Sequence, residues 1–503
     1  MADLPDPLSR PAPVAEPHRL TRRAVLGGLS AGAALTAAGV LWPGMAGAAS
    51  SGPDATPDAG SAAADLQSEA GAQARSAACD RDAVRRGLGF LQTMTDAYPA
   101  SNPGPRLAQS YADELGLFSS AFVYDNALAI CAALAAGPSG LSLARTLGDG
   151  LVFAAANDPD YSDGRLRQAY NVGPYTFYDG NRSPAGFVRA DGKANVGWQF
   201  GFLGTAVGDM AWAGIALAQL YRRTKAPAYL ATALRIGRWI TRTTLNPGAL
   251  GGFSIGVDGG NVSKPNVSTE HNIDCVALFG MLRTLTGDAA WTAAQRRARG
   301  FVDKMWNATD GFFWTGSNDG TTINQSPRPL DPQTWSWLAL RDRRYARALD
   351  WAGRELAVTD NGTGPNSEVL EGVSVSGVTF SDTSRTSTAQ YNGRPVEQSG
   401  VWLEGTAQQA TSLADRGGGA DRRAADALLA QVRTAQDRLG FGTAPGTPQH
   451  VGGADLPAGG GVVAATSLID TGFNFGYFRV QHVGATSWYV MAARRVNPLR
   501  LGL

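Results

Sequence analysis

Four carboxylates open apolar, small-residue segments of this 503-residue chain. The segments contain YDNAL, GDMAW, STEHN and WLEGT, and their carboxylates are Asp125, Asp209, Glu270 and Glu404. Two carboxyl groups in different surroundings can act as a general acid and a general base, because an apolar setting keeps one protonated and a polar setting keeps the other ionised. The four residues are therefore the first candidates for catalysis.

The immediate neighbours of two of these carboxylates suggest different roles. Glu404 follows Trp402 in an apolar stretch, which raises the pKa of a carboxyl group and favours a proton donor. Glu270 has His271 and Asn272 beside it, polar company that suits an ionised base or a sugar-binding carboxylate. We therefore predict Glu404 as the general acid and Glu270 as the base.

Each carboxylate also has a purely structural alternative. Ser268 or Thr269 can cap a helix while Glu270 stabilises the positive end of that helix. Asp125 and Asp209 can likewise be helix-capping residues and nothing more.

The elements that position these residues repeat along the chain. Six segments combine a polar or acidic opening with a small-residue apolar helix, at intervals of roughly 60 to 85 residues, and they begin at Tyr124, Gly208, Thr269, Asp331, Val401 and His482. Between them lie Arg-rich amphipathic helices with their charges on one face, near residues 80, 143, 227, 289, 343 and 421. The alternation predicts an all-α (α/α)6 toroid over residues 79–503, with six inner and six outer helices. Parallel inner helices bring their first turns, free N–H groups and dipoles to one rim.

Two insertions, residues 170–202 and 361–400, are too long for ordinary connectors and are expected to form walls or lids of a site. The second carries Glu368 and Glu371, which are alternative candidates for the base. Aromatic residues that can stack on sugar rings or pack in the core are Tyr170, Tyr175, Tyr178, Trp198, Phe253, Trp314 and Trp402.

With this pattern, residues 80 to 495 resemble the six-hairpin glycosidase superfamily, whose (α/α)6 enzymes cleave polysaccharides and oligosaccharides. The resemblance rests on the toroid pattern and on the four short motifs, and it implies a secreted bacterial glycoside hydrolase without a cofactor. Glycoside hydrolysis needs a carboxylic acid and a carboxylate, and we expect inversion of configuration with the two residues facing each other across the funnel. The expected catalytic residues are Glu404, Glu270 and Asp125; the expected substrate-binding residues are Tyr124, Asp209, Trp212, His271, Asn272, Gln333, Trp402 and His482.

Histidine chemistry supplies a second hypothesis. His271, His450 and His482, with Tyr124 and Arg479, can abstract protons in a polysaccharide lyase or a sugar epimerase built on the same toroid. A third hypothesis is a carbohydrate-binding protein without catalysis, in which the carboxylates are only helix caps.

The first 78 residues predict export. Arg22 and Arg23 precede an uncharged Ala/Gly/Leu-rich segment and AGA at 46 to 48, as in a twin-arginine signal peptide. We assign residues 1–48 to the signal and 49–78 to a flexible, small-residue linker. The mature protein is then expected outside the cytoplasm, without a membrane anchor.

Composition excludes several other classes of protein. With 44 basic and 43 acidic residues, the chain lacks the charge that nucleic-acid binding requires. Its cysteines are few, widely spaced and expected to be buried thiols, not a disulfide framework: Cys79, Cys131 and Cys275. The run NDPDYSDG has the wrong spacing for a calcium loop and is expected to be a solvated turn, so no metal site is predicted.

Overall fold

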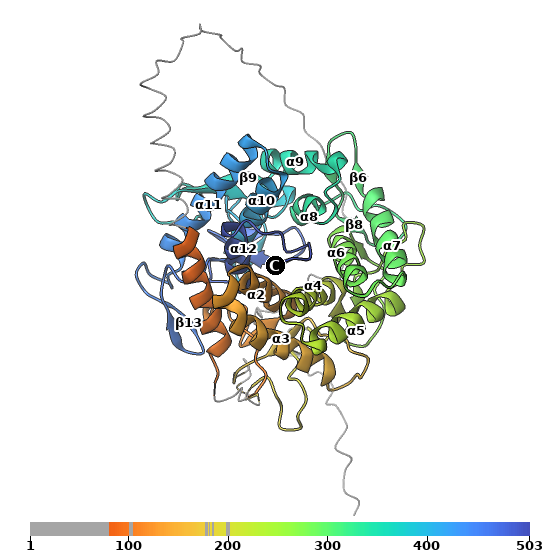
Figure 1. Cartoon of the computed structure of the whole chain (residues 1–503). Coiled ribbons are helices and arrows are strands. Elements are labelled where there is room, and N and C mark those ends of the chain that lie inside the picture. The colour runs from red at the N-terminus through yellow and green to blue at the C-terminus, as the bar shows by residue number, and fades with distance from the viewer. Residues whose placement is uncertain (1–79, 100–103, 177–179, 181, 184–185, 198–201) are drawn as a thin grey trace, which may run out of the picture.

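The computed structural model describes residues 80–99, 104–176, 180, 182–183, 186–197 and 202–503. Within these residues, twelve α-helices alternate along the chain between an inner and an outer ring (Figure 1). The signal peptide and linker expected over residues 1–78 lie outside the described residues, as do Cys79, Tyr178 and Trp198. Among the described helices, none has both the length and the apolar character that a membrane crossing requires.

The inner ring is built from every second helix. Each inner helix packs on the next, and the last packs on the first, so the ring is closed. Its members are α2 (Val123–Ala135), α4 (Val207–Thr224), α6 (Thr269–Thr286), α8 (Asp331–Leu340), α10 (Leu403–Arg416) and α12 (Val483–Ala493).

The outer helices pack against the inner ones. They are a helix over residues 80–96 and α3 (Leu141–Ala156), α5 (Pro227–Thr243), α7 (Ala290–Lys304), α9 (Arg347–Glu355) and α11 (Gly419–Leu439). Short 3-10 helices are η3 (Asp113–Leu115), η4 (Gly137–Gly140), η6 (Arg343–Tyr345) and η7 (Asp382–Arg385).

Residue type explains which ring each helix joins. Twelve of the thirteen residues of α2 are buried, and most are alanine or other small apolar residues, so helices can pack on several sides of it. In α5 the buried residues recur every three or four positions, and the opposite face carries the charges. The sequence pattern therefore separates inner from outer helices correctly.

The remaining regular structure consists of two-stranded antiparallel sheets. They pair β1 (Ser120–Phe122) with β2 (Ala169–Asn171), β3 (Thr205–Ala206) with β4 (Gly256–Val257), β5 (Val267–Ser268) with β8 (Gly316–Ser317), β6 (Trp306–Asn307) with β7 (Phe312–Phe313), β9 (Ala357–Asp360) with β10 (Val375–Val378), β11 (Gln390–Tyr391) with β12 (Arg394–Pro395), β13 (Gln449–Val451) with β14 (Ala454–Leu456), and β15 (Ile469–Asp470) with β16 (Gly476–Tyr477). The strands β1, β3 and β5 run directly into α2, α4 and α6, and thus fix where these helices begin.

The C-terminal segment packs across the ring at the ends of the inner helices. Gln219 in α4 donates to the carbonyl oxygens of Pro498 and Arg500, and Asn497 donates to the carbonyl oxygen of Leu338 in α8. Figure 1 places the C-terminus at the centre of the ring. This segment backs the end of the toroid that is opposite to the helix starts.

Two sequence predictions are confirmed at this level. The fold is all-α, and both described cysteines, Cys131 and Cys275, are free and buried. The NDPDYSDG run is not merely a solvated turn, because Asp158 is buried and forms an ion pair with Arg167 at 2.5 Å.

Candidate active site

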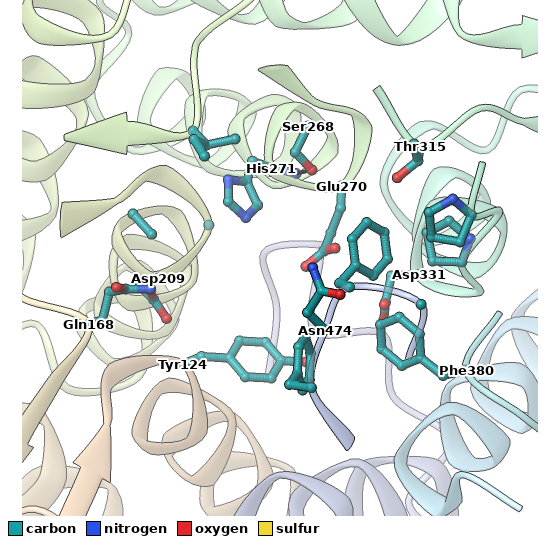
Figure 2. Close-up of a pocket in the computed structure, with 18 of the residues that line it drawn as sticks. Tyr124, Gln168, Asp209, Ser268, Glu270, His271, Thr315, Asp331, Phe380 and Asn474 are labelled. Atoms are coloured by element: carbon teal, nitrogen blue, oxygen red, sulfur yellow. Dashed lines mark hydrogen bonds between the residues drawn. The ribbon is translucent and has the colours of Figure 1, made fainter. Parts of the chain in front are cut away.

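A cavity of about 1250 Å³ opens at the rim where the inner helices begin. Figure 2 shows Tyr124, Asp209, Glu270 and Asp331 pointing into it from four different helices. Nine of the residues predicted from the sequence line this cavity: Tyr124, Asp125, Asp209, Trp212, Glu270, His271, Trp402, Glu404 and His482. The predicted convergence of inner-helix first turns therefore produces a single cavity wall.

Tryptophan side chains from alternate inner helices meet at the bottom of this cavity. Trp212 of α4, Trp335 of α8 and Trp488 of α12 are almost completely buried, with ring centroids 5.2 to 6.1 Å apart. Trp212 and Trp335 also line the cavity. Together with Tyr124, whose ring lies 5.6 Å from that of Trp212, they form its apolar floor.

Glu404 lies in the first turn of α10 and is only 1% exposed. The Tyr124 hydroxyl donates to its Oε1 at 2.6 Å, and Trp488 Nε1 donates to the Tyr124 hydroxyl at 3.2 Å. Its Oε2 has no hydrogen-bond partner among the described residues. Burial raises the pKa of Glu404 to about 8; the charge of His482 and the Tyr124 hydrogen bond act in the opposite direction.

Glu270 lies in the first turn of α6 and keeps some exposure to the cavity. The carboxyl group of Glu270 forms neither a hydrogen bond nor an ion pair with any described residue. Burial raises its pKa well above the ordinary value, and the charges of Asp331, Asp209 and Glu404 raise it further. Burial and the three neighbouring carboxyls thus favour the protonated form of Glu270, and no hydrogen-bond donor opposes them as Tyr124 does at Glu404.

Two further carboxyl groups share the cavity. Burial raises the pKa of Asp209 to about 7, and Asp125 adds to this shift; burial likewise raises the pKa of Asp331 to about 7. Sequence reasoning did not include Asp331 among the catalytic candidates, although it opens the inner segment DPQTW and the same first-turn rule selects it. Below Glu270, one turn along α6, Asp274 is fully buried, and burial raises its pKa well above the ordinary value.

The pKa of His271 is lowered, whereas that of His482 is raised. Burial lowers the pKa of His271 to about 4, so the ring is neutral at neutral pH. A Cβ at Gly208 would lie 2.6 Å from Cδ2 of this ring, so only glycine leaves room for it. His271 is therefore suited to a neutral hydrogen-bonding role at the wall.

Asn272 and Gln333, which the sequence suggested as substrate-binding residues, are fully buried and do not line the cavity. Asn272 accepts from the Phe253 amide at 2.9 Å and donates to the Phe253 carbonyl oxygen at 3.0 Å; Gln333 holds Phe313 in the same way at 2.8 and 3.0 Å. Their amides carry both a donor and an acceptor, which suits them to hold passing main chain. We remove both from the substrate-binding set.

Other sequence candidates also lie away from the cavity wall. Glu368 is held by Arg394 and Arg479, and Glu371 is exposed elsewhere, so neither replaces Glu270 as a cavity carboxylate. His450 is an exposed partner of Glu114. Besides Tyr124 and Trp212, the predicted aromatic residue that lines the cavity within the described chain is Trp402, whereas Tyr111, Phe380, Phe473 and Tyr477 line it without having been predicted.

The ring order corrects one expected relationship. Glu270 and Glu404 lie on α6 and α10, with α8 between them, so they are not diametrically opposite. The helix opposite α10 is α4, which carries Asp209. A shared rim position does not determine which two first turns face each other. That depends on the order of the helices around the ring.

The lining is rich in carboxyl groups and poor in cations. Among the described lining residues there is no arginine, and the single lysine, Lys264, is paired with Asp258 at 2.9 Å. In the described part of the chain, no group of three or more His, Cys, Asp or Glu residues is placed to hold a metal ion.

No protein-family model matches the chain, and no curated protein sequence matches it. Solved structures do. Cellobiose 2-epimerase from Bacillus thermoamylovorans superposes with a TM-score of 0.51 at 12% identity, covering 82% of this chain and 99% of that one. A sugar epimerase from a ruminal bacterium gives 0.51 at 11%, covering 82% and 98%. A family 76 glycoside hydrolase from a Bacteroides thetaiotaomicron strain gives 0.49 at 11%, covering 82% and 77%. The predicted architecture is confirmed: the chain has an (α/α)6-toroid fold.

Proposed function

We propose that the protein is a glycoside hydrolase in which Glu270 protonates the leaving oxygen and Glu404 activates the attacking water. The single observation that carries this proposal is the asymmetry between these two cavity carboxyls. Glu404 receives a hydrogen bond from Tyr124 at 2.6 Å and lies beside His482, and both favour its anion. Glu270 has no such partner among the described residues, and three neighbouring carboxyls favour its protonated form.

This assignment reverses the roles expected from the sequence. The residues that flank Glu404 along the chain are apolar, but its side chain meets Tyr124 and His482, which come from other helices. The cavity carboxyls repel one another's negative charge, so they do not all ionise together. Of Glu270 and Glu404, Glu404 ionises first, because it alone of the two accepts a hydrogen bond among the described residues. Acid and base then have the protonation states that hydrolysis requires.

The charge of the cavity supports a neutral saccharide as substrate. Uronic acids would bring a negative charge next to Asp331, Asp209 and Glu270, and the described lining offers no arginine to compensate. Tyr124, Phe473 and Tyr477 line the cavity and are only partly buried, so they offer aromatic surface to sugar rings.

We also propose inversion of configuration. Inverting enzymes hold their two carboxyl groups about 6.5–9.5 Å apart to leave room for water, and retaining enzymes hold them about 5–5.5 Å apart. Glu270 and Glu404 belong to inner helices separated by a third, which favours the wider spacing.

A sugar epimerase is the second candidate. It is favoured by the neutral ring of His271 and by the joint presence of Tyr124, His271 and His482 on the cavity wall. Epimerisation needs a base next to a carbon-bound proton, and a neutral imidazole can serve as one.

Incubation of the purified protein with a panel of neutral polysaccharides, their oligosaccharides and matching uronates tests these alternatives. We expect new reducing ends from a neutral glycan. Ultraviolet-absorbing unsaturated ends would indicate a lyase. A changed sugar configuration without new reducing ends would indicate an epimerase, and binding to a glycan without any product would indicate a binding protein. Any of these three results would contradict the hydrolase.

We further propose that the protein acts outside the cytoplasm, because Arg22 and Arg23 precede an uncharged small-residue segment. Replacing both arginines by lysine in the native host is expected to leave the protein in the cytoplasm. Unchanged export of this variant would contradict the twin-arginine assignment.

A further inference from the structure

His482 stands between two carboxylates that come from its two neighbouring inner helices. It is the N-cap of α12, with Asp125 on α2 on one side and Glu404 on α10 on the other. His482 Nε2 lies 3.1 Å from Oδ1 of Asp125, and Nδ1 lies 3.7 Å from Oε2 of Glu404. All three residues are at most 3% exposed, so their charges interact with little screening by water.

The two ring nitrogens of His482 have different tasks. Nε2 faces only the acceptor Asp125, and therefore carries a proton in either charge state of the ring. Nδ1 has two neighbours: it accepts from the Ala485 amide at 3.3 Å when unprotonated, and it points a proton towards Glu404 when protonated. The helix cap and the Glu404 carboxylate thus compete for Nδ1.

The remaining surroundings fix the ring in place between these partners. Tyr111 stacks on the imidazole with centroids 4.1 Å apart and ring planes 3° from parallel. Tyr477 approaches it at 6.3 Å. A Cβ at Gly484 would lie 2.7 Å from Asp125 Oδ1, 2.7 Å from His482 Cε1 and 2.8 Å from Glu404 Oε2, so only glycine permits the three groups to converge.

The other titratable groups near Glu404 are Tyr111, Tyr124, Glu270, Asp331 and Tyr477, and none of them is a cation. Among the described residues that line the cavity, Lys264 is paired with Asp258, and burial lowers the pKa of His271, which keeps that ring neutral. His482 is therefore the cation available to Glu404 within the described wall. Burial disfavours a charge on His482, but the Asp125 and Glu404 carboxylates outweigh it and raise the pKa of His482 above its ordinary value.

We propose that Asp125 is a positioning residue, not a catalytic one: it holds His482 as an imidazolium beside Glu404, and this cation stabilises the ionised form in which Glu404 acts as the base. The inference deepens the proposed hydrolase and rests on it for the role of Glu404. It also replaces the sequence expectation that Asp125 takes part directly in the chemistry. The charge coupling among the three residues exists whether or not a glycan is cleaved.

Nitrogen-15 NMR of the histidine rings over pH tests this proposal without a substrate. The chain has four histidines, so His18→Gln, His271→Gln and His450→Gln variants identify the signals of His482 by elimination. We expect His482 to titrate above the ordinary histidine value of 6.5 in the wild type and below it in Asp125→Asn, which keeps the acceptor oxygen but removes the charge. An unchanged titration in Asp125→Asn, or a neutral His482 throughout in the wild type, would overturn the proposal.

Glu404→Gln serves as the second variant if Asp125→Asn does not fold, because it is nearly isosteric and removes the other carboxylate. The titration of His482 is expected to fall in this variant as well, and an unchanged value would overturn the coupling. His450→Gln is the matched control, since His450 is exposed and pairs with Glu114 away from the cavity. A shifted His482 in a protein that hydrolyses no glycan would refute the proposed function and leave the coupling standing.

Discussion

The hydroxyl of Tyr124 in α2 donates a 2.6 Å hydrogen bond to Oε1 of Glu404 in α10, across the start of the intervening helix α12. Trp488 of α12 donates to the same hydroxyl at 3.2 Å, which directs its proton to Glu404. Three consecutive inner helices thus combine to stabilise one carboxylate. The bond is central to the proposed function because it favours the anionic form of Glu404.

Tyr124→Phe is expected to lower turnover by about 10- to 100-fold, the scale of a lost contribution to acid–base catalysis. Without the donor the pKa of Glu404 rises, so the acidic limb of the pH–rate profile moves to higher pH. Tyr345→Phe is the matched control, because Tyr345 donates to Asp303 at 2.5 Å far from the cavity. Equal pH profiles for wild type and Tyr124→Phe would contradict the role given to this hydroxyl.

Asp331→Asn is expected to move the acidic limb in the opposite direction. The negative charge of Asp331 raises the pKa of Glu404, so its removal lets Glu404 ionise at lower pH. The pH dependence of kcat/KM measures this shift. Asp310→Asn, an exposed change outside the cavity lining, should leave the profile in place, and a shift of the same size there would remove the significance of the Asp331 result.

Glu270→Gln is expected to stabilise the protein at alkaline pH. The folded-state pKa of Glu270 lies above its unfolded value, so the carboxyl costs no stability below the unfolded pKa and an increasing amount as pH rises towards the folded pKa. The gain in free energy of unfolding should grow by up to about 1.4 kcal/mol per pH unit above about pH 4.3. Denaturant unfolding at pH 4, 6 and 8 measures it, with exposed Glu371→Gln as the control. A gain that does not change with pH would refute the raised pKa.

Asn272→Leu and Gln333→Leu are expected to reduce stability without altering the chemistry. Each leaves a buried main-chain N–H and C=O without partners, at a cost of about 1–3 kcal/mol per group. Thermal melts should register this loss while kcat/KM of the folded fraction stays near the wild-type value. A specific loss of substrate binding would restore the two residues to the substrate-binding surface.

The sequence could predict the ring but not every occupant of the cavity wall. Helical spacing of Ala, Leu and Val separates inner from outer helices, so the starts of α2, α4, α6, α10 and α12 and their carboxylates or histidine follow directly. Asp331 follows from the same rule, because it opens the inner segment DPQTW, but it was not among the predicted carboxylates. The first-turn pattern does not distinguish a residue that lines the cavity from one whose side chain holds a neighbouring main-chain segment. Asn272 and Gln333 were therefore predicted in the cavity, although both are buried against main chain.

The roles of Glu270 and Glu404 depend on contacts between distant segments. Tyr124 and Glu404 are 280 residues apart, and Asp125 and His482 are 357 apart. Chain neighbours such as Trp402 predict the burial that raises the pKa of Glu404, but not the Tyr124 and His482 side chains that reach it from other helices. Only the closed ring brings the donors to Glu404 and leaves Glu270 among other carboxyls.

The central claim is that Glu270 is the acid and Glu404 the base. Both Glu270→Gln and Glu404→Gln are expected to lower turnover of a natural glycan by at least about 100-fold, with little change in binding. A leaving group that is a weak base departs without much help from a proton donor, so it depends less on the acid Glu270. The attacking water still needs the base Glu404, whatever the leaving group is.

The decisive measurement is turnover of both variants on aryl glycosides of the same sugar whose phenols differ in acidity. The account predicts that the defect of Glu270→Gln shrinks at least about tenfold for the most acidic phenol, while that of Glu404→Gln stays constant. Recovery by Glu404→Gln instead, or near-normal turnover of either variant on the natural glycan, would contradict it.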